Sequence, residues 1–186
     1  MIHNSLITMS GAPASTFTVV NSMTGEKYEL SEEALKVSGV LGAQIEDDGD
    51  ADEEVVIIHR HGELVTLALE FLEYYAAHPF ETKDEEGNVT WNVKLRGPDF
   101  SDNVDYENKD RTAAHWYAEF MTRVGPKFDE KEELKNEGDK RWYEVNDELL
   151  EKTDRLFQMM EVSNYLMCDP LFQLIHCKIG ETAWKG

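Results

Sequence analysis

The feature that most constrains the fold is a division into two strongly patterned flanks around a weakly patterned middle. Apolar residues recur at strand or helix spacing over residues 16–79 and again over 139–186. Residues 80–138 mix charged residues with glycine and proline, and they contain too few apolar residues for a core of their own. We therefore expect one domain built from both flanks, with 80–138 as a peripheral insertion and 1–15 as an N-terminal tail.

The first flank alternates between strand and helix patterns. Residues 16–20 and 27–30 are β-branched, aromatic or alternating, and a turn sequence joins them, so they predict a β-hairpin. A serine cap and early glutamates predict a helix over 31–47. A short apolar strand over 55–58, joining the hairpin in one sheet, and a helix over 62–78 follow.

The second flank is helical, and the insertion holds two ordered islands. Helices are predicted over 141–150, over 156–166 and from Asp169 onward, with Thr153 and its neighbour ending the first of them. Within the insertion, 89–95 alternates like a strand and 110–124 has helical spacing. The order of elements predicts a mixed α/β (α+β) chain in which helices dominate.

Charge narrows the classes of partner. The chain has 38 acidic and 18 basic residues, a formal net charge of −20, and residues 46–54 hold seven acids and no base. Such a surface repels nucleic acid and anionic lipid, so basic protein partners are favoured and the acidic run is expected to be a solvated loop. No apolar run reaches about 18 residues, so no membrane span is expected. Two cysteines, Cys168 and Cys177, predict a reduced cytoplasmic or nuclear protein.

The residue types that carry chemistry form no specific constellation. His59 and His61 could face one metal, but no further ligand is fixed by spacing, and a solvated strand end is the simpler interpretation. His176 beside Cys177 does not make a nucleophile pair, because adjacent helical residues do not face each other. No phosphate loop, dinucleotide fingerprint or nucleophile elbow occurs. We therefore predict a non-enzyme with no catalytic residue, cofactor or metal.

One stretch of sequence carries a family resemblance. Residues 156–166 read Leu-Phe-Gln-Met-Met-Glu-Val-Ser-Asn-Tyr-Leu. This resembles the Leu-Phe-Glu-Leu-Ile-Leu-Ala-Ala-Asn-Tyr-Leu helix of the SCF ubiquitin-ligase adaptor (Skp) and elongin C family. Cys177 and Lys178 fall where that family also has Cys-Lys, and the hairpin, acidic loop, third strand and next helix occur in the family's order. The likeness covers about two thirds of the chain and is interrupted by the insertion.

The resemblance implies a BTB/POZ-like fold, a small three-stranded sheet flanked by helices, in a protein that holds other proteins together. In the family, the Asn-Tyr position contacts a cullin, which maps to Asn164 and Tyr165. The aromatic cluster around Trp116 and Phe120 either packs on its own domain or docks onto a partner. The expected partner-binding residues are Asn164, Tyr165, Leu156, Met160, Leu171, Ile175, Trp116 and Phe120.

Two functions remain open at this point. A cullin-ligase adaptor would grip a cullin and the F-box-like or elongin-box-like helix of a receptor. A structural subunit would use the same apolar faces permanently in a large cytoskeletal, ciliary or kinetochore assembly. The Asn-Tyr pair, which this chain shares with the family helix, favours the first function. The second is favoured by the long insertion and by the end of the chain at Gly186, where the SCF adaptor continues into helices that clamp an F-box. Without those helices, apolar surface on 149–166 and 171–178 is expected to stay open for a partner helix.

Overall fold

A computed structural model of the chain describes residues 16–48, 54–94, 111–125 and 147–184. Strand β1 (Thr16–Asn21) is the centre of a three-stranded sheet of order β2-β1-β3. It pairs antiparallel with β2 (Lys27–Ser31) and parallel with β3 (Val55–Ile57), with Val19 opposite Tyr28 and Val55. The predicted hairpin, and its union with the third strand in one sheet, are confirmed.

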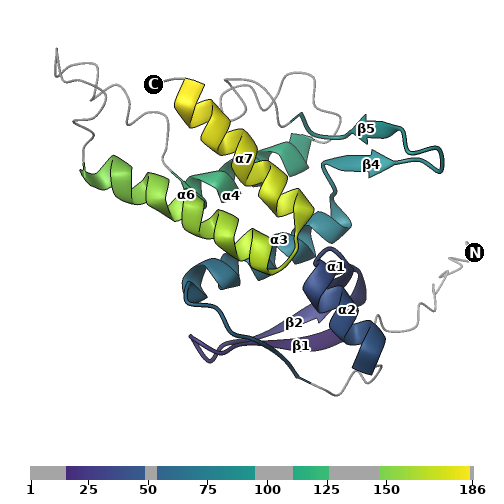
Figure 1. Cartoon of the computed structure of the whole chain (residues 1–186). Helices are drawn as coiled ribbons and strands as arrows, with labels where there is room; N and C mark the ends of the chain where they lie inside the picture. The colour runs from purple at the N-terminus through teal and green to yellow at the C-terminus, as the bar shows by residue number, and fades with distance from the viewer. Residues whose placement is uncertain (1–15, 49–53, 95–110, 126–146, 185–186) are drawn as a thin grey trace, which may run out of the picture.

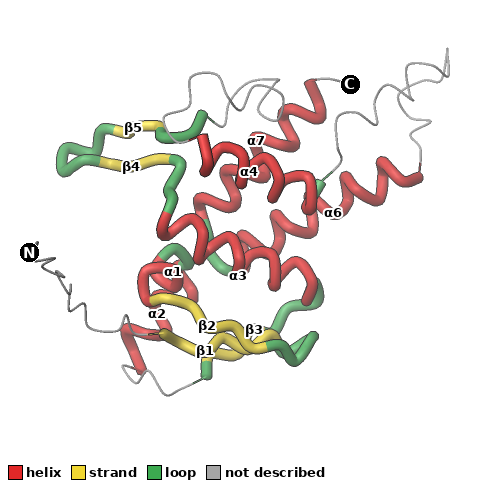
Figure 2. The backbone as a smooth tube through the Cα atoms, turned by 180° about the vertical axis from the view of Figure 1, so that it is seen from behind, coloured by secondary structure: helices red, strands yellow, loops and turns green. Residues whose placement is uncertain are grey.

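The helices lie mainly on one side of this sheet (Figures 1 and 2). Helix α3 (Gly62–Ala77) contacts both the sheet and α6 (Asp147–Tyr165), and so forms the middle layer of the molecule. A separate small hairpin, β4 (Glu81–Lys83) with β5 (Val89–Trp91), projects from the helical end. The helices are α1 (Glu32–Lys36), α2 (Gly39–Asp48), α3 (Gly62–Ala77), α4 (Arg111–Val124), α6 (Asp147–Tyr165) and α7 (Asp169–Trp184). The predicted α/β (α+β) class is confirmed for the described residues.

Local signals explain where several helices begin and end. The Ser31 hydroxyl accepts a hydrogen bond from the Ala34 amide at 3.2 Å, so the expected serine cap of α1 is present. Helix α3 ends at Ala77, just before Pro79, which cannot continue a helical hydrogen-bond ladder. Helix α7 begins at Asp169, whose carboxylate lies where the helix dipole favours negative charge.

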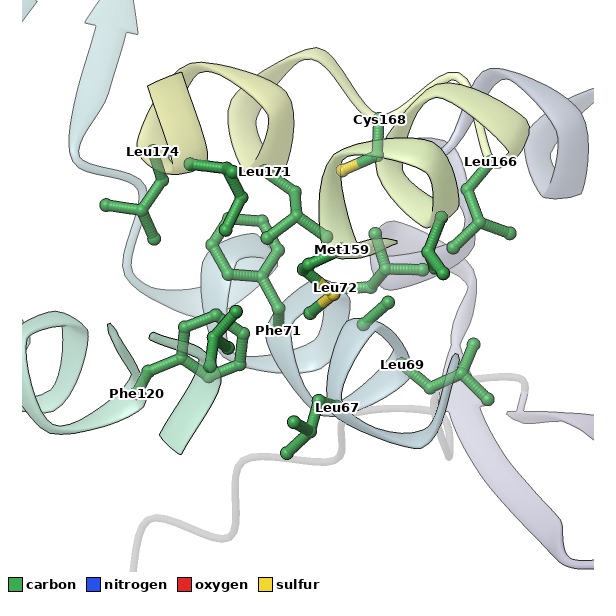
Figure 3. Packing of buried hydrophobic residues seen from close by; sticks show 14 of the residues in the cluster. Leu67, Leu69, Phe71, Leu72, Phe120, Met159, Leu166, Cys168, Leu171 and Leu174 are labelled. Carbon is green, nitrogen blue, oxygen red and sulfur yellow. The ribbon is translucent and has the colours of Figure 1, made fainter. Parts of the chain in front are cut away.

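The buried apolar residues form one continuous cluster around α3. Figure 3 shows side chains from α3, α4, α6 and α7 converging there, among them Phe71, Phe120, Met159 and Leu171. The Phe71 ring lies 5.6 Å from that of Phe120 and 6.1 Å from that of Tyr117. Both flanks and α4 therefore contribute to a single core.

The expected peripheral position of residues 80–138 is wrong for their described part. Phe80, Val93, Tyr117 and Phe120 are fully or almost fully buried, and the Tyr117 hydroxyl donates a hydrogen bond to the His78 carbonyl at 2.6 Å. Few apolar residues occur across the whole segment, but those of α4 gather on one helical face, which packs on α6 and on Phe71 of α3. The low apolar content averaged over residues 80–138 does not reveal that the apolar residues of α4 lie together on one face.

Three expected elements also differ from the structure. The helix predicted over 31–47 is two helices, α1 and α2, that meet at Ser38. The break predicted at Thr153 is absent, because α6 runs without interruption through it. The strand predicted over 89–95 is shorter and belongs to the unexpected β4–β5 hairpin. The acidic run over 46–54 begins inside α2, which reaches Asp48. The tail 1–15 and residues 141–146, with Trp142 and Val145, lie outside the described residues.

Candidate interaction surface

Asn164 and Tyr165 lie at the C-terminal end of α6, and both are exposed, as the Asn-Tyr resemblance predicts for contact residues. The Tyr165 side chain is 40% exposed. This end of α6 turns into α7 next to the first helices of the chain (Figure 1), where the Gly39 amide donates to the Met167 carbonyl at 3.2 Å. The pair therefore sits on a turn that is tied to the N-terminal flank.

The turn after Tyr165 has an unusual residue at its apex. Met167 has a φ of 49°, the left-handed conformation that glycine normally supplies at the end of a helix. Its amide donates to the Asn164 carbonyl at 3.1 Å, and the Cys168 amide donates to the Ser163 carbonyl at 2.9 Å, the bond pattern of a Schellman motif. Although its conformation is unfavourable for a side chain, Met167 carries a large apolar one that is 64% exposed. A side chain held in this conformation, with its apolar surface exposed, motivates the hypothesis that the turn is a contact site.

The segment between β3 and α3 lies against Tyr165. The His59 ring is 5.0 Å from the Tyr165 ring and 5.4 Å from the His61 ring. The His61 amide donates to His59 Nδ1 at 3.2 Å, so Nδ1 must be unprotonated for this bond to form. His59 is the group that connects the strand end to the helix end.

An ionic group continues the surface along α6. Arg60 pairs with Glu161, and His61 Nε2 lies 3.2 Å from the same carboxylate oxygen. Hydrogen bonding from Arg60 and then from His61 lowers the pKa of the Glu161 carboxyl. Since Glu161 and Tyr165 are four residues apart, they share one face of the helix. The Tyr165 surface, as used below, comprises His59, Arg60, His61, Glu161, Asn164, Tyr165 and Met167.

We expect His59 to titrate below the ordinary histidine range of about 6.5. Burial lowers its pKa first, and the nearby His61 and Arg60 charges act in the same direction. Because the unfolded chain binds this proton more readily, stability is present above about pH 6.5 and falls as the pH drops toward the folded-state pKa. Imidazole chemical shifts followed by NMR against pH measure the value directly. Tyr165→Ala, which uncovers the ring, should raise the midpoint toward 6.5; an unchanged midpoint would show that Tyr165 does not bury His59.

The apolar surface expected on α6 and α7 is not open. Of the four apolar contact residues expected there, Leu156, Leu171 and Ile175 are fully buried and Met160 is partly exposed. At Leu156 the reason is the end of α4: Gly125, the residue after this helix, lies so close that an added Cβ would be 2.7 Å from Leu156 Cδ2. The insertion helix therefore packs on this part of α6, so the expectation of an open groove for a partner helix at these residues is wrong.

The aromatic pair proposed on α4 is also largely internal. Phe120 is buried, which excludes it as a surface contact. Trp116 is half-buried, stacked on Tyr74 at 3.8 Å and on Phe120 at 5.2 Å between ring centroids. The cluster packs on its own domain, the first of the two alternatives that the sequence left open.

The remaining candidates for chemistry include the two cysteines, of which Cys168 is buried. Burial raises the pKa of the Cys168 thiol to about 12, so this sulfur stays protonated and is a poor nucleophile. Within the described ranges, no three His, Cys, Asp or Glu side chains are grouped so that they could hold a metal ion. No described helix combines the length and apolar character needed to cross a membrane.

Neither the comparison with protein-family models nor the comparison with curated proteins found a match. The functional argument therefore rests on the Tyr165 surface itself. Sequence reasoning named Asn164 and Tyr165, which lie on this surface, but named neither Met167 nor the Arg60–Glu161 pair. The four-residue spacing of Glu161 and Tyr165 places both on one helical face, and this spacing is a sequence signal that could have added Glu161 to the predicted surface. Nothing in the sequence indicates a methionine in the left-handed conformation.

Proposed function

We propose that this chain is a non-enzymatic protein–protein adaptor or structural subunit of the Skp and elongin C type, which holds a partner protein within a larger complex. The observation that carries the proposal is the exposed end of α6, where Asn164, Tyr165 and Met167 present amide, phenol and thioether groups side by side. Tyrosine and methionine are enriched at protein interfaces because they bury large areas and adapt to a partner.

A BTB/POZ-like arrangement is part of the proposal. It is supported by a hairpin whose first strand also pairs in parallel with β3, and by helices packed mainly on one side of that sheet. The burial of the α6–α7 face supports a structural subunit over a receptor-gripping adaptor, because Leu156 and Leu171 are already covered within the chain.

A cullin-type ubiquitin-ligase adaptor is the second candidate. It is favoured by the exposure of both Asn164 and Tyr165, the positions that contact cullins in the family that the sequence resembles. Because the two candidates use the same surface, they differ in the identity of the partner rather than in the residues that bind it.

The test uses two variants that act on the surface in different ways. Tyr165→Ala removes an interface anchor and should weaken partner binding by about 2 kcal/mol, ~30-fold in Kd. Met167→Gly removes exposed apolar surface but relieves the left-handed backbone, so it should raise stability by about 1 kcal/mol while also weakening binding. A variant that folds better and binds worse cannot be explained by misfolding.

Affinity purification of the full chain with quantitative mass spectrometry measures the outcome, and thermal unfolding checks each variant. The matched control is Phe157→Ala, which removes an aromatic ring 44% exposed on the same helix about 12 Å toward its start. Cullin peptides lost in both variants and kept in the control would establish the ligase adaptor. A fixed non-cullin set with the same response would establish the structural subunit. Equal recovery of all partners by all variants would refute the proposed surface.

A further inference from the structure

The outer edge of β3 is open within the described part of the chain. The sheet order places β1 on one side of β3 and no described strand on the other. The two residues that turn away from the helices, Val56 and Ile58, are 50% and 69% exposed, whereas Ile57 between them is buried. An open apolar strand edge is a template for pairing with another strand, and proteins usually protect it.

The backbone of this edge points its free groups outward at defined residues. The Ser22 amide donates to the Ile57 carbonyl at 2.9 Å, so the Ile57 carbonyl faces β1. Because successive residues of an extended chain direct their N–H and C=O groups to opposite edges, those of Val56, and of Ile58 directly after the strand, face the open edge. Added strands must therefore form their hydrogen bonds at these two residues.

The charges that flank this edge have opposite signs. Glu54 precedes β3 and Arg60 follows it, and their side chains are 49% and 71% exposed. Both have partners within the chain, Lys27 and Glu161, but exposed ion pairs of this kind exchange at little cost. A strand that runs antiparallel to β3 and carries the same sequence would place its basic end beside Glu54 and its acidic end beside Arg60.

We propose that β3 pairs with β3 of a second copy of this chain, antiparallel, about a two-fold axis that passes beside Ile57. In this register Val56 lies opposite Ile58 of the other copy, and the two residues exchange both backbone hydrogen bonds. Glu54 lies opposite Arg60 at each end. Shifting the axis to Val56 would place Glu54 against Ile58, and shifting it to Ile58 would place Arg60 against Val56. Only the central register matches apolar with apolar and acid with base.

The second copy fits this edge because a two-fold contact must be self-complementary, and this short strand is. The contact is small compared with the roughly 1,600 Å² of a standard interface, so the dimer is weak and concentration-dependent. Net charge opposes it, since each copy carries −20. Salt at physiological strength screens that repulsion beyond about 8 Å and leaves the close Glu54–Arg60 contacts in place.

The dimer is tested by analytical ultracentrifugation of the full chain and of charge-reversal variants, over a concentration series at about 0.15 M salt. Glu54→Arg and Arg60→Glu should each lower the association constant about tenfold, because each places like charges at both ends of the contact. The double variant reverses both charges, keeps the net charge of the natural chain, and should restore association to within about twofold of the natural chain.

Two further variants separate the edge from general effects. Ile58→Lys should abolish the dimer, and Val89→Lys, which adds the same charge to an exposed valine on β5, should not. Thermal unfolding confirms that each variant is folded. A natural chain that stays monomeric at the highest concentration reached, or a double variant no better than the singles, would overturn the β3 pairing.

Discussion

Replacing Phe120 with alanine is expected to lower the free energy of unfolding by about 3–5 kcal/mol. The Phe120 ring is buried between Phe71 of α3 and Trp116 of α4, at 5.6 Å and 5.2 Å between ring centroids. Its removal leaves a cavity in the layer that joins α4 to α3, and the surrounding helices can close it only in part. Urea denaturation of the purified variant, with the slope of the transition compared as well as its midpoint, measures the loss.

The control is Phe157→Ala, because Phe157 is the same residue type on a helix of the same core but is exposed. Its cost should stay within about 0.5 kcal/mol. If both alanine variants cost the same small amount, α4 does not belong to the core and the original expectation of a peripheral insertion would be restored.

The Phe120 result bears on what the sequence predicts well and what it does not. The hairpin, β3 and α3 were predicted correctly because alternation and helical spacing are local and uninterrupted there. Helix α4 was also located correctly, yet its place in the fold was not. The local sequence pattern predicts that a helix or strand exists. Which elements pack against it depends on contacts between residues far apart in sequence, such as Gly125 with Leu156.

The candidate surface shows the same limit. Resemblance pointed to Asn164 and Tyr165, and the structure leaves both exposed. The same reasoning placed Leu156 and Ile175 on an open face, although α4 and the core bury them. His59 was interpreted as a solvated strand end, while its ring in fact packs on Tyr165. What the sequence lacks in each case is the identity of the segment that covers the residue.

The position of α4 changes how the chain holds a partner. The face of α6 around Leu156 is covered by α4, so binding there would first require α4 to leave, at the cost of the Phe120 and Tyr117 contacts with Phe71. The Tyr165 surface needs no such rearrangement, because Asn164, Tyr165 and Met167 are already exposed. This difference is the physical reason for placing the proposed partner at the end of α6.

The second large effect is expected at the junction of α1 and α2. Ser38 is buried, and its hydroxyl donates to the Leu166 carbonyl at 2.6 Å while accepting from the Leu41 amide at 3.2 Å. This bond joins the N-terminal flank to the end of α6 across 128 residues. It also explains why the predicted single helix breaks here: the serine caps α2, and α2's first amides, including that of Gly39, bond to carbonyls of the α6–α7 turn.

Ser38→Ala should therefore lower the free energy of unfolding by about 1–3 kcal/mol, since it leaves buried polar groups without this partner. Ser163→Ala is the matched control, because Ser163 is equally buried but bonds only to the Met160 carbonyl of its own helix, and its cost should stay below about 1 kcal/mol. Urea unfolding gives both values. Hydrogen exchange adds a local test: in Ser38→Ala the Gly39 and Cys168 amides, which are bonded in the turn, should exchange faster than those in the middle of α3. Equal costs for the two serines, or unchanged exchange at the turn, would show that the turn bearing Tyr165 and Met167 is held by apolar packing alone.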